Sequence, residues 1–131
     1  MTVQLVLASG SPRRQQYLSG LGLDFIADAP NVDETPLKNE KPMDYVKRVT
    51  LDKARQTGRR HQNAHILAAD TTVCVGRRIL GKPEDTNEAA RMLRLMSGRR
   101  HNVLTAICLI DARGREQIRL VKTAVKIKPL R

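Results

Sequence analysis

The residues best suited to chemistry begin with a turn of small side chains followed by two arginines. Residues 8–14 read ASGSPRR and follow the short apolar run QLVLA. Small residues let the backbone approach a ligand, and a helix starting at Pro12 points free N–H groups at it, which favours phosphate. Arg13 and Arg14 add charged donors. The alternative is a capped helix with two solvated arginines, and spacing alone leaves it open because short Gly/Ser turns are common. Arginine in a first turn is unfavourable toward the helix dipole, so an anionic partner would account for the pair.

Two acidic positions can bind a metal or move a proton. Asp33 and Glu34 are adjacent in a proline-bounded loop, where they can hold Mg²⁺ or Mn²⁺, although a solvated acidic loop is the simpler interpretation. Asp70 ends the apolar run ILAA, where α/β sheets place ligand sites, and can bind a metal or take a proton from water. It can instead cap a turn. The abrupt change from apolar to polar residues favours the functional interpretation.

Other candidates are ambiguous when taken singly. Lys82, in LGKP, can meet a phosphate, although the segment is no Walker loop. Lys53 on a predicted helix can add another cation or lie at the surface. His101 has no cysteine or serine placed as its nucleophile, so we interpret it as structural. We expect His61 and His65 to be solvated in a polar connection.

These residues require a framework of alternating strands and helices. Ser11 and Gly22 suit the N-cap and C-cap of the first helix. Strands that alternate with helices before a final hairpin indicate one α/β domain over residues 1–131, with a mixed sheet and flanking helices. We expect strands at 4–8, 24–27, 66–69, 72–75, 79–80, 102–110 and 117–127, helices at 12–21, 42 to about 58 and 85–98, and a loop at 30–41.

Composition narrows the class of protein. The chain of 131 residues fits one domain, and its net charge of +11 attracts polyanions such as nucleotides, nucleic acids or anionic lipids. Cys74 and Cys108 lie in apolar runs, which indicates buried thiols. The N-terminal apolar run precedes the basic residues, the reverse of a secretory signal, and no run is long enough to cross a membrane. We therefore expect a cytoplasmic protein.

The order of the motifs closely resembles the Maf family of nucleoside triphosphate pyrophosphatases. The motifs are LASGSPRR, VDE, YVKRVTLDKA, ILAADT, LGKP and MLRLMSGRRHNVLTAICL. The resemblance implies the α/β fold shared with inosine-triphosphate pyrophosphatases, a homodimer and a divalent metal, Mg or Mn. It also implies cleavage of a nucleoside triphosphate between the α and β phosphates.

The resemblance also implies a role for each matched residue. Asp70 matches the catalytic aspartate and Glu34, with Asp70, the metal site. Arg13 after the SP pair and Thr71 after Asp70 are similar to the specificity positions of the dTTP/UTP type. The phosphate-binding positions are matched by Ser9, Arg14, Lys53 and Lys82. From these segments together we expect a single anion-binding cleft, with cations on one side and two acids on the other.

One difference from the family concerns length. Family members continue through a segment resembling EPxDKAGaYxIQG, whereas this sequence stops at Arg131, so we expect a fold incomplete at its C-terminus. An inactive truncated family member is therefore one alternative. A basic nucleic-acid-binding protein is another, but three aromatic residues offer little stacking surface and no binding signature is present, so nucleic acid is not expected as a partner.

Overall fold

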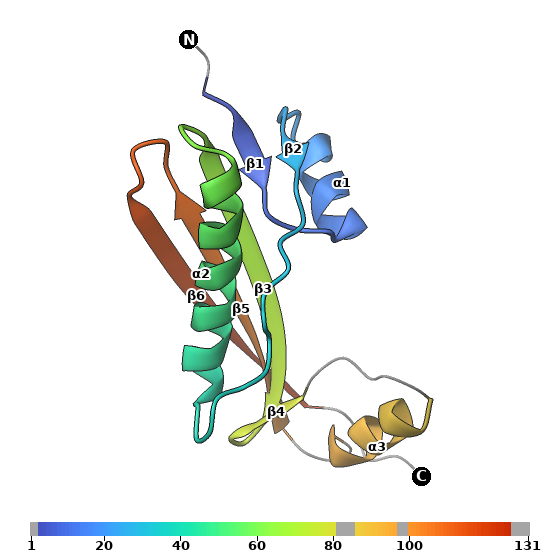
Figure 1. The fold of residues 1–131 in the computed structure, drawn as a ribbon. Helices are drawn as coiled ribbons and strands as arrows, with labels where there is room; N and C mark the ends of the chain where they lie inside the picture. The colour runs from blue at the N-terminus through green and yellow to red at the C-terminus, as the bar shows by residue number, and fades with distance from the viewer. Residues whose placement is uncertain (1–2, 81–85, 97–99, 127–131) are drawn as a thin grey trace.

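The computed structural model describes residues 3–80, 86–96 and 100–126 as a mixed sheet with helices on both faces, as predicted (Figure 1). α2 covers one face of the sheet and α1 lies on the other (Figure 1). α3 lies apart from both helices, near the end of the sheet that carries β4. In chain order the elements are β1 (Leu5–Leu7), α1 (Pro12–Gly20), β2 (Ile26–Ala27), α2 (Pro42–Arg60), β3 (His65–Val75), β4 (Arg78–Leu80), α3 (Thr86–Met96), β5 (Arg100–Ile110) and β6 (Glu116–Lys126).

The sheet has the strand order β2-β1-β3-β5-β6, and β4 pairs with β3. β1 runs parallel to both β2 and β3, whereas β4 and β5 are antiparallel to β3, and β6 is antiparallel to β5. The predicted hairpin is confirmed: β5 and β6 are joined by a tight turn in which Gly114 has φ +87°, a conformation that glycine adopts without steric cost. The three longest strands, β3, β5 and β6, are therefore consecutive in the sheet, with β3 at its centre.

One edge of β3 changes partner along its length. β5 pairs with one edge from Ile66 to Cys74, so β1 and β4 share the other edge. β1 pairs with β3 only up to Leu67, and β4 begins to pair at Val73. Within the described residues, no strand pairs with this edge over residues 68–72. We call this stretch the β3 notch, and it contains Asp70.

α2 covers one face of the sheet and forms the main core with it. Pro42 occupies its first turn, where the missing N–H costs no hydrogen bond, and its apolar residues recur at helical spacing. Val46, Val49 and Ala54 are fully buried, and alternate residues of β3, Ile66 and Ala68 among them, lie beneath the helix. The α2 face therefore has a packed apolar core that can hold polar site residues in position.

The opposite face is covered less completely. α1 begins at Ser11, whose hydroxyl accepts a hydrogen bond from the backbone N–H of Arg14 as the N-cap prediction requires. Leu18 is the buried residue of this helix. Ile107 and Val121, on the same face of β5 and β6, remain 42% and 54% exposed. The central sheet is therefore asymmetric, with its core on the α2 side.

Several local expectations need correction. The strand expected to end at Asp70 is continuous through Val75, because its pairing with β5 does not stop at the polar residues. His61 and His65 are half-buried rather than solvated: His61 Nε2 lies 2.6 Å from Asp28, and His65 Nδ1 accepts the N–H of Ala112. The capping residue Asp85 and the closing Gly98 predicted for α3 lie outside the described residues.

Candidate active site

An ion-pair cluster at the β3 notch joins three elements. Lys53 Nζ lies 3.1 Å from Glu34 Oε1 and 3.3 Å from Asp70 Oδ1. The side chains of Lys53 and Asp70 are only 16% and 15% exposed, whereas that of Glu34 is 53% exposed. One cation is thus held between two carboxylates, one fixed on a strand and one on a loop open to solvent. We call these three residues the acid–lysine cluster.

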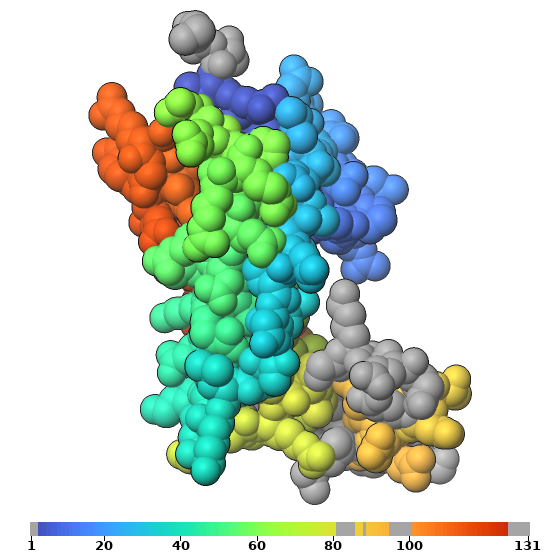
Figure 2. Space-filling view, viewed as in Figure 1, coloured from blue at the N-terminus to red at the C-terminus, as the bar shows by residue number. Residues whose placement is uncertain are grey.

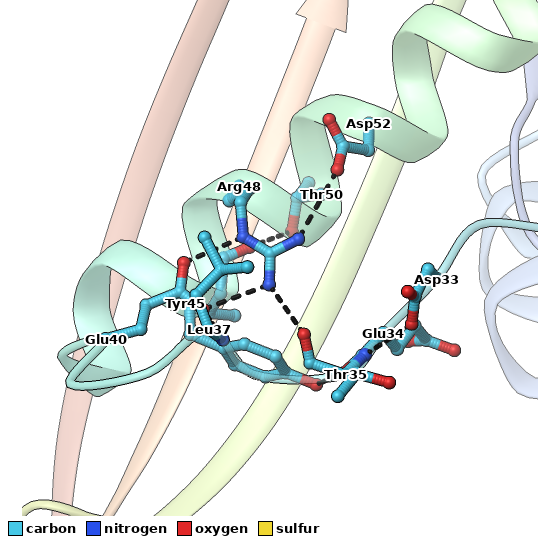
Figure 3. A network of polar contacts seen from close by, with 10 residues as sticks. Asp33, Glu34, Thr35, Leu37, Glu40, Tyr45, Arg48, Thr50 and Asp52 are labelled. Carbon is cyan, nitrogen blue, oxygen red and sulfur yellow. Dashed lines mark hydrogen bonds and ion pairs between the residues drawn. The ribbon is translucent and has the colours of Figure 1, made fainter.

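The loop that carries Glu34 is tied to α2 by side chains of the helix. Tyr45 donates its hydroxyl proton to the backbone carbonyl of Glu34 at 2.6 Å, and Arg48 donates to the carbonyl of Thr35 at 3.0 Å (Figure 3). Farther back, Gln56 bonds both backbone polar groups of Asn31. Figure 2 shows the loop, in cyan, packed along the green α2. A loop without regular structure therefore presents Glu34 from a defined position.

Arg48 is the centre of this polar network. Its guanidinium makes two hydrogen bonds to Glu40, at 2.7 and 3.0 Å, and lies over the ring of Tyr45 (Figure 3). The hydrogen bonds from Arg48 lower the pKa of Glu40, because they stabilise its ionised form. Burial raises the pKa of Tyr45, and the negative charges of Glu34 and Asp70 raise it further, so its hydroxyl stays protonated as a donor.

The small-residue turn joins β1 to α1 beside the notch. Ser9 is buried, and its hydroxyl accepts the backbone N–H of Ser11. A side chain at Gly10 would approach the Cβ of Ala29 to 3.3 Å, so the turn is closely packed against the following segment. Arg14 reaches from α1 to the notch, where Nη1 donates to the carbonyl of Ala69 at 2.9 Å. The Arg14 guanidinium is therefore hydrogen-bonded to the residue that precedes Asp70.

A cavity of about 380 Å³ lies between α1 and the sheet. Its walls are mainly aliphatic, with Leu7, Leu67 and Ile107 from the sheet. The hydroxyls of Thr71 and Thr105 lie 3.2 Å apart within its lining. Because successive side chains of a strand alternate between its faces, Thr71 opens onto this cavity while Asp70 faces α2. Four side chains of α1 also line the cavity: Arg13, Arg14, Tyr17 and Leu18.

Comparison with known protein families gives a match over nearly the whole chain. The model of the family described as "Maf-like protein" matches residues 4–131. The chain belongs to the Maf family. Among curated relatives, the dTTP/UTP pyrophosphatases of Sphingopyxis alaskensis and Zymomonas mobilis are 48% and 43% identical to it. These matches cover 96% and 99% of this chain but 66% and 65% of the relatives, so the chain spans about two thirds of their length.

Solved structures show the same fold at low sequence identity. A nucleoside-triphosphatase/dITP/XTP pyrophosphatase from Mycobacterium abscessus matches with a TM-score of 0.62 and 18% identity, covering 95% of this chain and 74% of that one. A HAM1 protein from Coxiella burnetii gives the same TM-score and identity, covering 95% and 73%. The chain therefore shares its fold with these structures, as its resemblance to the Maf family implied.

The structure brings together some, but not all, of the residues expected at a Maf site. Glu34, Lys53 and Asp70 are in direct contact, and Arg14 approaches the same notch from the other face. Arg13 and Thr71 line the cavity on the α1 side. Ser9 lies in the turn before α1, and Lys82 falls outside the described residues. The described candidates therefore occupy two regions, the acid–lysine cluster on the α2 face and the cavity on the α1 face, and Arg14 reaches the edge of β3 between them.

The acid–lysine cluster has a donor set that suits a divalent metal. Carboxylate oxygens are the ligands that Mg²⁺ and Mn²⁺ prefer, and those of Glu34 and Asp70 already converge on one cation, the Lys53 ammonium. No group of three or more acidic, histidine or cysteine side chains that could hold a metal occurs in the part of the chain that the structure describes. These two carboxylates therefore need further oxygen ligands to complete a metal site.

Three residues of the site were not predicted from the sequence. These are Tyr45 and Arg48 on α2 and Thr105 on β5. The helical spacing that buries Tyr45 also aims its hydroxyl at the loop, and a tyrosine on a buried helix face is a signal for such a bond because its hydroxyl needs a partner. Thr105 had no local signal, since its contact depends on the pairing of β3 with β5.

Proposed function

We propose that the chain provides the catalytic region of a nucleoside triphosphate pyrophosphatase that converts dTTP and UTP to the monophosphate and pyrophosphate. The observation that carries the proposal is the acid–lysine cluster beside Arg14, which combines carboxylates for a metal with cations for phosphate oxygens. Relatives that are 43–48% identical and named dTTP/UTP pyrophosphatases support the substrate class.

The reaction requires a water oxygen to attack the α phosphorus while the bond to the α–β bridging oxygen breaks. Asp70 is suited to accept the water proton, or to hold a metal with Glu34, and pyrophosphate leaves with the bridging oxygen. Arg14 and Lys53 neutralise phosphate oxygens, and Ser9 and Lys82 are proposed as further phosphate contacts. A bound Mg²⁺ or Mn²⁺ supplies charge stabilisation for the phosphates. No covalent nucleophile is needed.

The β3 notch offers a route for a nucleotide between the two faces. In this proposal the base occupies the cavity on the α1 side, where Arg13 and Thr71 act as specificity residues. The phosphates then pass Arg14 at the β3 notch and reach the acid–lysine cluster on the α2 side. A volume of about 380 Å³ and mainly aliphatic walls suit the flat ring of a pyrimidine.

The wider setting is also a proposal. Cys74 and Cys108 are free and buried, which fits a reducing cytoplasm. No helix of the described residues is long and apolar enough to span a membrane. A homodimer remains a prediction from the family resemblance. The charge of +11 is accounted for in part by cations that meet phosphate, so nucleic acid is not proposed as a partner.

The decisive experiment is a pyrophosphate-release screen across nucleoside triphosphates with Mg²⁺ and with Mn²⁺. We expect release from dTTP and UTP by this chain, and its loss in Asp70→Asn. A form extended to the length of the relatives is assayed in parallel. Release by the extended form alone would support the proposed site but show that this chain is not sufficient for activity. Binding to DNA that weakens steeply with salt, together with no hydrolysis by either form, would instead favour the nucleic-acid-binding alternative.

A further inference from the structure

We infer that Lys53 is an exchangeable counter-ion: its ammonium holds Glu34 and Asp70 until a divalent cation binds to these carboxylates, and it then moves to a phosphate group of the nucleotide. The inference rests on the proposed function, because it assigns the sequence in which the same site receives metal and substrate. It adds that Lys53 and the metal compete for the same oxygens, so that removing the lysine strengthens the binding of a metal alone.

The geometry supports competition rather than coexistence. One ammonium contacts a single oxygen of each acid, at 3.1 Å on Glu34 and 3.3 Å on Asp70. A metal bridging these carboxylates must lie among the same oxygens, at about 2.0–2.6 Å from each. The divalent ion and the ammonium would then lie only about 3–4 Å apart, where they repel by several kcal/mol even at an effective dielectric constant of about 20. The lysine therefore has to leave when the metal arrives.

The surrounding structure allows that exchange. Glu34 is 53% exposed on a loop, so its carboxylate can adjust to a smaller cation, whereas Asp70 is fixed on the central strand. Lys53 has a flexible four-carbon stem, which lets its ammonium swing without movement of α2. Arg14 reaches the same notch from the other face and adds a second cation for phosphate oxygens. The released ammonium thus stays where phosphate is expected.

Exchange has a consequence for the order of binding. Two carboxylates already neutralised by a lysine make a weak metal site, and the described residues supply no third acid, histidine or cysteine to the group. Nucleotide phosphates supply oxygens to the metal and a new partner to Lys53 at the same time. Metal and nucleotide therefore bind with positive coupling, which is reciprocal by thermodynamic necessity.

The test measures Mn²⁺ binding in the absence of nucleotide, from the electron paramagnetic resonance signal of free Mn²⁺. The proteins are wild type, Lys53→Met and the matched control Lys47→Met, which removes the same charge from an exposed position on the same helix. We expect Lys53→Met to bind Mn²⁺ at least roughly tenfold more tightly than wild type, and Lys47→Met to differ by less than about twofold. Lys53→Gln serves as a second variant if the methionine form fails to fold.

An independent readout uses the wild-type chain alone. Acetylation by a lysine-selective reagent, followed by mass spectrometry, reports the accessibility of each ammonium. We expect the labelling rate of Lys53 to rise when Mn²⁺ is added, because the ammonium leaves its two carboxylates, while the rate at Lys47 stays constant. An unchanged rate at Lys53 under Mn²⁺ saturation would contradict the exchange.

The inference is overturned if Lys53→Met and Lys53→Gln bind Mn²⁺ no more tightly than wild type, which includes no measurable binding by any form. Failure of the proposed function gives a different pattern. In that case the Mn²⁺ affinity still rises on removal of Lys53, but neither this chain nor its extended form releases pyrophosphate from any nucleotide.

Discussion

The two faces of β3 place opposite kinds of chemistry on consecutive residues. On the α2 face, Asp70 belongs to a largely buried ion-pair cluster held by hydrogen bonds from a packed helix. On the α1 face, Thr71 opens onto a mainly aliphatic cavity that is also lined by its hydroxyl contact with Thr105 and by the side chains of Arg13 and Arg14. In the proposed function, one strand thereby serves different parts of the same ligand from its two faces.

The faces also differ in how firmly their loops are fixed. The acidic loop of the α2 face is bonded to its helix by Tyr45, Arg48 and Gln56, each through a backbone group of the loop. On the α1 face, Arg14 supplies the bond from the helix to the notch. We therefore expect substitutions on the α2 face to change metal binding and turnover, and those on the α1 face to change nucleotide preference.

The largest effect is expected for Asp70→Asn on the α2 face. Loss of the carboxylate removes the proton acceptor or metal ligand, so pyrophosphate release should fall by about 10²–10³-fold or more. The amide keeps the shape of the side chain, and Lys53 retains its bond to Glu34, so the far-ultraviolet circular dichroism spectrum should be unchanged. Asp24→Asn, at an exposed position, is the control and should retain wild-type turnover.

On the α1 face, Thr71→Val and Thr105→Val remove the hydroxyl pair without a large change in volume. We expect each to change the ratio of kcat/KM for dTTP to that for dCTP by about tenfold, because a polar contact to the base is lost. Mn²⁺ affinity should stay at the wild-type value. Thr123→Val, exposed on β6, is the matched control. Equal loss of activity toward every nucleotide would break the proposed division between the faces.

A smaller effect is expected for Tyr45→Phe, which deletes the bond to the carbonyl of Glu34. The free energy of unfolding should fall by about 1 kcal/mol, the typical contribution of one hydrogen bond. Turnover should also require several-fold more Mg²⁺, because the loop no longer fixes Glu34. Tyr17→Phe, whose ring is 69% exposed on α1, should leave both the stability and the Mg²⁺ requirement unchanged. A normal Mg²⁺ requirement in Tyr45→Phe would show that the loop is positioned by other contacts.

The smallest effect is a dependence of stability on pH through Glu40. Hydrogen bonds from Arg48 lower the pKa of Glu40 below its ordinary value of 4.5. The stabilisation is therefore complete above about pH 4.5 and is lost as the pH falls through the lowered pKa. Urea unfolding should show Glu40→Gln to be less stable than wild type at pH 7, with the difference shrinking toward about pH 3. A constant difference across this range would exclude the ion pair as its cause.

The sequence alone was sufficient for those features that depend on local chemistry. Ser11 and Pro12 fixed the start of α1, Pro42 fixed the start of α2, and alternation of strands and helices gave the mixed α/β class. The contact of Lys53 with Glu34 and Asp70 joins three residues that the sequence indicates as site candidates, although their ion pairs were not predicted.

Features that depend on distant pairing could not be predicted. Asp70 looked like a strand end because polarity changes there, but β5 pairs with β3 across that point. The contact of Thr71 with Thr105 follows from the same register, which no local pattern encodes. His65 looked solvated because its neighbours are polar, yet it accepts a bond from Ala112 at the distant hairpin. Long-range register, rather than local propensity, decided each of these outcomes.

The short strands that pair with β3, β1 and β4, also affect how the nucleotide preference of such a protein can change in evolution. β1 stops at Leu7 beside Leu67, and β4 pairs only from Val73 onward through Leu80, so no described strand pairs with this edge of β3 around residue 70. In the proposed function, a mutation at position 71 remodels the wall that meets the base and leaves the neighbouring carboxylate untouched. Duplicated genes can then diverge in the nucleotide they remove while inheriting the same hydrolytic apparatus.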